Sequence, residues 1–224
     1  MQKRLVRYIE DRSRIFSAMS HDLKTPITRL RLRAEMLEDE EQRRRFEKDL
    51  KEMEAMVSES LEFMRGLEGK LNRQPVDIMA LLESLQADHA EMGHPVGIEG
   101  KAVAPFPGDA ALLKRCLGNL VDNAIRYGQR ATVIVDDRAE SLTLRIQDEG
   151  PGISELEREK VFEPFYRIEA SRSRDTGGTG LGLSIARNIV ERHNGAITLQ
   201  NRPSGGLEVA VNLPRIVAPG PAFT

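Results

Sequence analysis

Apolar residues in the first third of the chain recur at the spacing of amphipathic helices. From Ile9 to Leu37 every seventh position is apolar, and Ile27 and Ala34 are interleaved with these positions. After a polar interruption at 38–42 the pattern resumes, which predicts two helices in an antiparallel hairpin. The heptad positions are Ile9, Phe16, Leu23, Leu30 and Leu37 in the first helix and Phe46, Leu50, Met53, Val57, Met64 and Leu67 in the second.

One hairpin offers too little apolar surface to cover both stripes. Pairing two copies about a twofold axis would bury them in a four-helix bundle, and we therefore predict a homodimer. The alternative is that the hairpin packs against the C-terminal half of its own chain.

The pattern changes after a polar segment with one glycine, residues 68–74. Short runs typical of strands then mix with helical stretches, which predicts an α/β sandwich with helices on one face of a mixed sheet. We expect a helical hairpin at 1–67, a hinge at 68–74, an α/β domain at 75–215 and a disordered tail at 216–224. The expected strands are Ala131–Val135, Leu142–Gln147, Ala196–Gln200 and Leu207–Leu213, and the expected helices are Ile78–Met92, Ala110–Tyr127 and Leu183–His193.

The charge of the chain is nearly balanced, with 33 basic and 35 acidic residues and a net charge of −2. This balance gives no support for a nucleic-acid partner or for broad binding to anionic membranes. The single cysteine, Cys116, has leucine neighbours, so we expect a buried thiol in a reducing compartment. No apolar run approaches the ~20 residues that span a bilayer, and no signal peptide is visible, so we expect a soluble cytosolic piece.

The stretch SHDLKTP, residues 20–26, places a histidine beside an acid within the first predicted helix. Thr25 lies one turn beyond His21 on the same face, so its hydroxyl can reach a group attached to the imidazole. Asp22 flanks the ring and could accept a hydrogen bond from Nδ1–H, which leaves Nε2 as the nucleophile. Pro26 removes a backbone donor and should bend the helix one turn after His21.

Two asparagines four residues apart lie in LGNLVDNAIRYG, residues 117–128. Asn119 and Asn123 therefore project from one helical face, and their amide oxygens are hard, neutral ligands suited to Mg²⁺. Arg126 could meet phosphate oxygens, and the ring of Tyr127 helps to define the neighbouring surface. Taken alone, the two asparagines are equally well explained as ordinary exposed helix residues.

The stretch DEGPGI follows a predicted strand directly. Asp148 supplies a carboxylate there, and Gly150 and Gly152 let the backbone turn sharply and approach a ligand. The carboxylate could accept from the exocyclic amine of adenine, whereas guanine presents a carbonyl at that place, so we expect ATP rather than GTP. By itself this motif is also a common turn.

A glycine-rich run leads into the last predicted helix, although the chain contains no GxxxxGK[ST] motif. Unpaired amide groups and the positive helix end would face the same spot and form a phosphate cradle. The polar segment 171–176 has the character of a lid, and we expect Phe162, Phe165 and Tyr166 to hold one end of it. The cradle residues are Gly177, Gly178, Thr179, Gly180, Leu181 and Gly182.

These motifs together resemble those of a known family. FSAMSHDLKTPITRLRLRAEML is similar to the phosphoacceptor box of bacterial two-component sensor histidine kinases. The glycine and asparagine motifs, over about 110–200, resemble the ATP-binding domain that these kinases share with gyrase-type and mismatch-repair ATPases. The resemblance implies that His21 is autophosphorylated, that Asp22 acts as general base and that Thr25 positions water when the partner is dephosphorylated.

The same resemblance implies a nucleotide site and a set of partners. The implied partners are a second copy of the chain and a response regulator that receives the phosphoryl group on an aspartate. It also implies a membrane anchor upstream of this region, in a bacterial inner-membrane protein whose catalytic part faces the cytoplasm. Its site residues are Asn119 and Asn123 for Mg²⁺ and phosphates, Asp148 for adenine, and Gly178, Gly180 and Gly182 for the triphosphate.

Two other functions are compatible with the motifs. The first is a nucleotide-gated scaffold that mainly removes phosphate from the regulator, an activity that can coexist with the kinase. The second is a gyrase-type ATPase that turns over ATP without a covalent intermediate, although nothing like the transducer domain of such enzymes is present.

Overall fold

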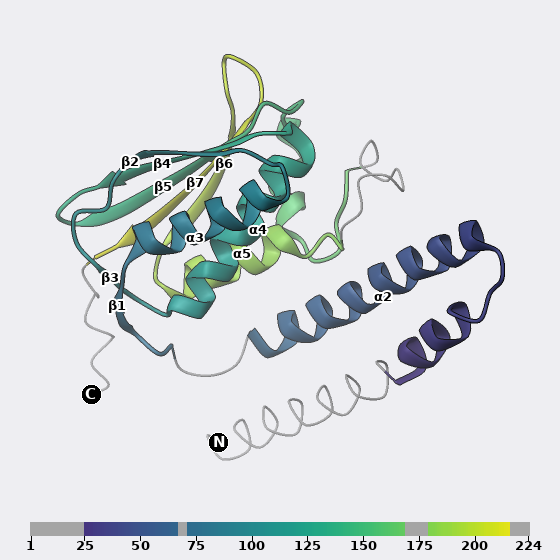
Figure 1. The fold of residues 1–224 in the computed structure, drawn as a ribbon. Helices are drawn as coiled ribbons and strands as arrows, with labels where there is room; N and C mark the ends of the chain where they lie inside the picture. The colour runs from purple at the N-terminus through teal and green to yellow at the C-terminus, as the bar shows by residue number, and fades with distance from the viewer. Residues whose placement is uncertain (1–24, 67–70, 169–178, 216–224) are drawn as a thin grey trace. The chain divides into compact units, whose positions relative to one another are not determined.

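The computed structural model describes residues 25–66, 71–168 and 179–215. Backbone proximity divides the chain into two compact units, one of residues 1–69 with 172–181 and the other of residues 70–171 with 182–224. Each unit has its own architecture (Figure 1). The expected tail at 216–224 lies outside the described residues.

The first unit contains the predicted antiparallel helical hairpin. Residues 25–34 are helical, and α2 spans Glu40–Gly66. Asp39 caps α2, because its Oδ1 accepts the N–H of Glu41 at 2.9 Å and that of Gln42 at 3.1 Å. The two helices share a small apolar cluster of Ile27, Ala34 and Leu50, with Leu37 and Val57 packed against it.

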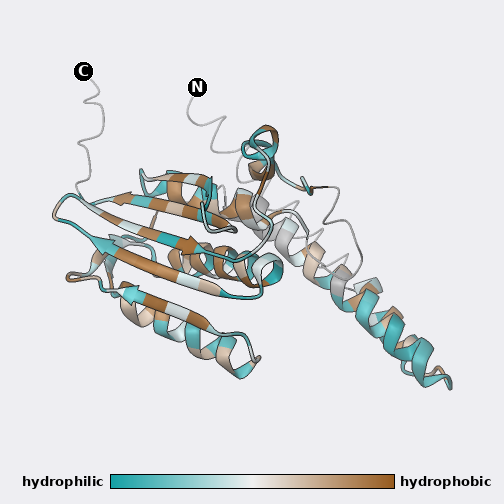
Figure 2. Cartoon of the chain, turned by 90° about the horizontal axis from the view of Figure 1, so that it is seen from above, coloured by the Kyte–Doolittle hydropathy of each residue, from teal (hydrophilic) through white to brown (hydrophobic). Residues whose placement is uncertain are grey.

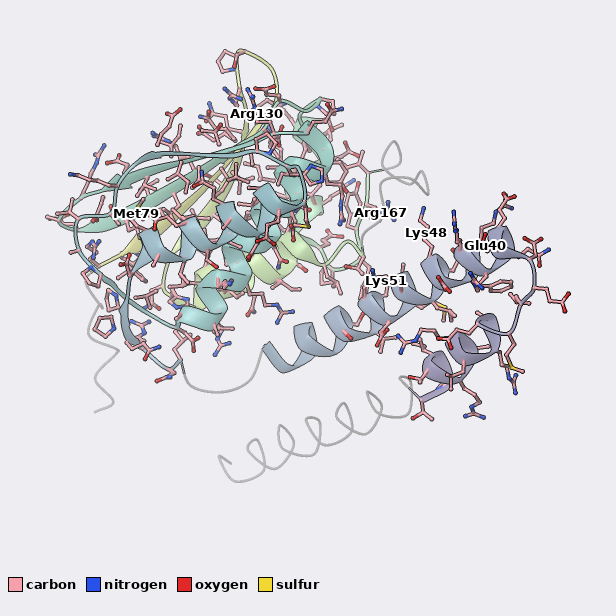
Figure 3. The ribbon with its side chains drawn as sticks, viewed as in Figure 1. Glu40, Lys48, Lys51, Met79, Arg130 and Arg167 are labelled. Carbon is pink, nitrogen blue, oxygen red and sulfur yellow. The ribbon has the colours of Figure 1, made fainter. Side chains whose placement is uncertain are left out.

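The hairpin leaves part of its heptad pattern uncovered. Leu30 is 45% exposed, Phe46 52% and Met53 46%. Phe46 and Met53 are seven residues apart and therefore share one face of α2, while charged side chains such as Lys48 and Lys51 extend from the same helix (Figure 3). Within one chain, this apolar surface remains in contact with solvent.

The second unit is built on a five-stranded mixed sheet in the order β2-β4-β5-β7-β6. Strand β2 is parallel to β4, and the other neighbours are antiparallel. A separate two-stranded sheet pairs β1 with β3. The strands are β1 Gln74–Val76, β2 Val96–Gly100, β3 Phe106–Gly108, β4 Ala131–Asp137, β5 Ser141–Gln147, β6 Ala196–Asn201 and β7 Leu207–Pro214.

Three helices, α3 (Ile78–Glu91), α4 (Ala110–Gly128) and α5 (Gly182–Arg192), cover one face of this sheet (Figure 1). Buried residues alternate with less buried ones along β4, β5 and β7, and Figure 2 shows the matching alternation of hydropathy. One sheet face therefore packs on the helices and the other meets solvent. This arrangement confirms the predicted α/β sandwich.

The helix that carries most of the predicted site, α4, has well-defined ends. Asp109 precedes it, and its Oδ1 accepts the N–H of Leu112 at 3.2 Å. At the other end Gln129 adopts a left-handed conformation with φ 61° and donates its N–H to Ile125 O. Among the described residues, no helix combines the length and the apolar character needed to cross a membrane.

Candidate functional site

The predicted nucleophile region lies mostly outside the described residues. His21 and Asp22 lie outside them, and so do Gly177 and Gly178 of the glycine-rich run. Thr25 is the first described residue, and it is helical and exposed. The geometry of the remaining predicted site residues therefore concerns α4, α5 and the loop after β5.

The middle of α4 faces the beginning of α5. A Cβ added to Gly182, the first residue of α5, would lie 3.6 Å from Asn123 Nδ2 and 3.8 Å from Asn119 Cβ. The two asparagines thus stand together beside a helix N-terminus, whose free N–H groups carry partial positive charge. A phosphate group at this place would meet both amides and the helix end.

The side chain of Asn119 shows that this place suits an acceptor. Its Nδ2 is buried and has no hydrogen-bond partner among the described residues. A buried donor without a partner costs free energy that a ligand oxygen can recover. The described part of the chain holds no cluster of three His, Cys, Asp or Glu side chains that could bind a metal. The amide oxygens of the two asparagines, together with phosphate oxygens, are hard ligands of the kind that suits Mg²⁺.

The carboxylate of Asp148 is held at one oxygen and open at the other. The side chain follows β5 and is 7% exposed. Its Oδ1 accepts the N–H of Gly150 at 2.8 Å and that of Leu207 at 2.9 Å. Oδ2 has no hydrogen-bond partner among the described residues. The side chain is thus fixed in rotation while it presents one acceptor to a ligand.

The C-terminal end of α4 lies directly against this loop. A Cβ on Gly150 would fall 2.7 Å from Tyr127 O, and one on Gly128 would fall 2.6 Å from Asp148 Cβ. Neither position has room for a side chain, so α4 and the loop after β5 meet backbone to backbone. Gly128 is a site residue that the sequence reasoning missed, although a glycine at a helix end is a detectable signal.

For the other predicted site residues the structure gives exposure, backbone conformation and one hydrogen bond. Arg126 is exposed and Tyr127 is 39% exposed. Gly180 has a φ of 75°, and the N–H of Leu181 donates to Thr179 Oγ1 at 3.3 Å. These residues keep their predicted roles as proposals.

The aromatic residues before the predicted lid differ in how far they are buried. Phe162 is buried and lies under the Arg187 guanidinium, whose Cζ is 4.9 Å from the ring centroid. Phe165, by contrast, is 58% exposed with a φ of 66°. The ring of Phe165 is therefore not packed in the core, and its expected role at the end of the lid segment stays a prediction.

Two buried residues near the helices are structural. The Cys116 side chain is buried as predicted, and burial raises the pKa of its thiol to about 12, so it remains a thiol. His193 is 2% exposed and joins α5 to α4, because its Nδ1 lies 2.7 Å from Ile189 O and its Nε2 accepts the N–H of Asp109 at 3.1 Å. This geometry requires a neutral ring with the proton on Nδ1.

Exposed charges around the loop contribute little to its position. Arg130, labelled in Figure 3, lies with its Nη1 3.9 Å from Glu149 Oε1. Both side chains are more than half exposed, and such pairs are worth only ~0–1 kcal/mol. Backbone contacts and buried hydrogen bonds therefore define the site.

The donor set fits an adenine nucleotide with Mg²⁺. Asp148 Oδ2 can accept from an exocyclic amine, and the Asn119 amide with the N-terminus of α5 can bind phosphate oxygens. Both groups lie along α4, so a bound nucleotide would have its base near the C-terminal end of this helix and its phosphates near the middle. A purine triphosphate is the class of ligand with this pairing of groups.

Two family models match successive parts of the chain. The model for the His Kinase A (phospho-acceptor) domain matches residues 11–69. The model for the histidine kinase-, DNA gyrase B- and HSP90-like ATPase matches residues 108–216. These two domains define the class of protein as the catalytic core of a histidine kinase.

Individual proteins point to the same family. The chain is 44% identical to the sensor histidine kinase GtrS of Pseudomonas aeruginosa over 96% of this chain and 45% of that protein. It is 30% identical to the sensor histidine kinase CpxA of Escherichia coli over 94% of this chain and 48% of that protein. The chain thus spans about half the length of the curated relatives that it matches.

Solved structures show the same fold. Histidine kinase AdeS of Acinetobacter baumannii matches with a TM-score of 0.63 and 25% identity, over 87% of this chain and 98% of that one. Full-length ShkA in complex with AMPPNP matches with a TM-score of 0.71, over 93% of this chain and 47% of that one, and its 22% identity supports the fold alone. The chain belongs to the bacterial two-component sensor histidine kinases, as its motifs indicated.

Proposed function

We propose that this chain is the catalytic core of a protein histidine kinase. It uses ATP to phosphorylate His21 and passes the phosphoryl group to an aspartate of a response-regulator receiver domain. The observation that carries the proposal is the arrangement along α4. There the open Oδ2 of Asp148 and the unpaired amide of Asn119 are disposed for the two ends of one nucleotide.

The residues divide the work of holding the nucleotide. Asp148 accepts from the adenine amine, and Gly150 and Gly152 bring the loop backbone close to the base. Asn119 and Asn123 bind the phosphates and Mg²⁺ beside Gly182 at the N-terminus of α5. When bound, Mg²⁺ neutralises phosphate charge during the transfer. The remaining proposed contacts come from Arg126, Tyr127, Gly178, Thr179, Gly180 and Leu181.

His21 carries the chemistry. Its Nε2 attacks the γ-phosphorus, so that an N–P bond forms, the P–O bond to the leaving ADP breaks and the electron pair stays on the ADP oxygen. Asp22 accepts a hydrogen bond from Nδ1–H and takes up that proton as positive charge develops on the ring. The phosphohistidine then transfers its phosphoryl group to the receiver aspartate.

The same region supports a phosphatase activity toward the phosphorylated regulator. Thr25 is exposed one turn from His21, where its hydroxyl can orient a water molecule. The regulator would approach the hairpin below His21, where Arg29, Arg31 and Arg33 offer cationic contacts. Kinase and phosphatase thus share one surface of the helix.

The exposed heptad residues support a homodimer. Leu30, Phe46 and Met53 are each about half exposed in one chain, and a second hairpin about a twofold axis would cover them in a four-helix bundle.

We place the intact protein in the bacterial inner membrane, with this region facing the cytoplasm, through a segment upstream of this chain.

Incubation with γ-labelled ATP and Mg²⁺ tests this function. The parent chain should acquire a label that is stable in base and labile in acid. His21→Gln should abolish the label, whereas His94→Gln, which alters an exposed histidine of the α/β unit, should retain it. Steady ATP turnover without covalent label would instead identify a gyrase-type ATPase. Loss of phosphate from a labelled regulator without histidine label would identify a phosphatase scaffold.

A further inference from the structure

Asn201, the last residue of β6, and Arg202, which follows it, hold both ends of the loop that carries Asp148. Asn201 accepts the N–H of Ile153 on Oδ1 and donates from Nδ2 to Ile153 O, both at 2.9 Å. Arg202 donates from Nη1 to Asp148 O at 2.7 Å. Asp148 and Ile153 lie at the two ends of this loop, so one corner of the β6–β7 hairpin fixes both the beginning and the end of the loop.

Both polar atoms of the Asn201 amide bind the backbone of a single residue. Asn201 is exposed, so water could satisfy both of its polar atoms, yet both contact the backbone of one residue 48 positions away. Gly152 next to Ile153 has a φ of 73°, and a Cβ there would fall 2.7 Å from Asn201 Oδ1. The loop conformation and the asparagine therefore fit one another closely.

The turn after Arg202 completes this contact with Asp148. Leu207 N–H donates to Asp148 Oδ1 at 2.9 Å, and Asp148 N–H donates to Leu207 O at 3.0 Å. A Cβ on Gly206 would fall 2.0 Å from Asp148 O. The carboxylate thus takes its orientation from the same hairpin corner that clamps the loop.

We propose that Asn201 and Arg202 are positioning residues that set the preference for a 6-amino purine. The inference rests on the proposed function and extends it to residues that do not touch the nucleotide. Discrimination between an amine and a carbonyl at purine position 6 depends on where Asp148 Oδ2 points. Loosening the clamp leaves Asp148 in the chain but lets its carboxylate vary in position, so the preference falls.

The experiment compares ATP with ITP, which differs in having a carbonyl in place of the 6-amine. Dissociation constants of both, with Mg²⁺, are measured by titration calorimetry on the full chain and on Asn201→Ala and Arg202→Met. The matched control is Asn212→Ala on β7, which removes an exposed amide that donates to Thr143 Oγ1 at 3.2 Å. Autophosphorylation rates over a range of ATP concentrations separate KM from kcat.

We expect each clamp variant to bind ATP about tenfold more weakly, as for the loss of one or two hydrogen bonds. ITP binding should change little, so the ATP-to-ITP ratio falls by about the same factor. KM for ATP should rise while kcat at saturating ATP stays near that of the parent. Asn212→Ala should match the parent in every measurement.

A purely structural role gives a different pattern. It would lower the unfolding temperature or the folded fraction of Asn201→Ala while the ATP-to-ITP ratio stayed unchanged, and that result would overturn the inference with the kinase function intact. If Asn201→Ala does not fold, Arg202→Met decides by the same ratio. A parent chain that binds neither nucleotide would overturn the proposed function and this inference together.

Discussion

Substituting Gly128 by alanine should separate α4 from the loop that carries Asp148. The added Cβ would fall 2.6 Å from Asp148 Cβ, 2.7 Å from Glu149 N and 2.9 Å from Gly150 N. Real Cβ contacts are longer than this, and the neighbours are mostly backbone atoms, so the loop itself must move. Overpacking of this kind costs about 1–3 kcal/mol of the free energy of unfolding.

The same substitution at Gly118 provides the control. Gly118 lies in the interior of the same helix, and its added Cβ would meet only Leu85 Cδ2 at 3.7 Å. Alanine should therefore stabilise the helix by about 0.5–1 kcal/mol through its lower conformational entropy. Gly128→Ala should therefore be less stable than the parent and Gly118→Ala more stable, with a difference of about 3 kcal/mol between the free energies of unfolding of the two variants.

Urea unfolding followed by circular dichroism measures this difference, since the chain contains no tryptophan. With a slope of about 1–3 kcal/mol per molar, the midpoints of the two variants should differ by about 1–3 M. Gly128→Ala should also weaken ATP binding about tenfold or more, because Asp148 moves with the loop. If Gly128→Ala proves as stable as Gly118→Ala, the close contact of α4 with the loop is refuted.

Three further predictions concern buried groups outside the site. Burial, as the largest cause, lowers the pKa of His193 below its usual value of 6.5, so the unfolded chain binds more protons than the folded chain as the pH falls through that value. The free energy of unfolding should therefore fall as the pH drops from 7 toward 5, and it should fall less steeply in His193→Gln. Arg215→Met should lower the free energy of unfolding by about 3 kcal/mol, because it leaves the Asp137 carboxylate, whose side chain is 5% exposed, without the guanidinium that now lies 2.7 Å away. The double variant with Asp137→Asn should recover part of this loss in urea unfolding. Cys116, with its thiol pKa raised to about 12 by burial, should resist a thiol-specific disulfide reagent in the native chain and react once urea unfolds it; rapid native reaction would contradict its burial.

The regular core of the α/β unit could be predicted from the sequence because its elements have clear periodicity. Leu142–Gln147 was expected as a strand and Ser141–Gln147 is observed, with strict alternation of buried residues. Strands β1, β2 and β3 were not predicted, because they are short and contain proline or glycine. Strand β1 begins at Gln74, the last residue of the expected hinge.

The chemistry of the site could be predicted only in part. Asp148 and the asparagines follow local motifs, so their candidacy needed no tertiary structure. The contacts that orient Asp148 come from Arg202 and Leu207, more than fifty residues away along the chain, and Asn201 holds Ile153 at the other end of the loop from 48 residues away. Such pairings depend on which strands are neighbours in the sheet, and no local pattern reports that. The same limit applies to the bond between His193 and Asp109.

Mass-spectrometric localisation of the phosphoryl group tests the central claim most directly. The full chain is incubated with ATP and Mg²⁺ and then digested without exposure to acid. The proposed mechanism predicts one phosphorylated peptide, with the group on His21, and a large reduction of it in Asp148→Asn. A phosphoryl group on another residue, or ATP hydrolysis with no phosphopeptide, would contradict it.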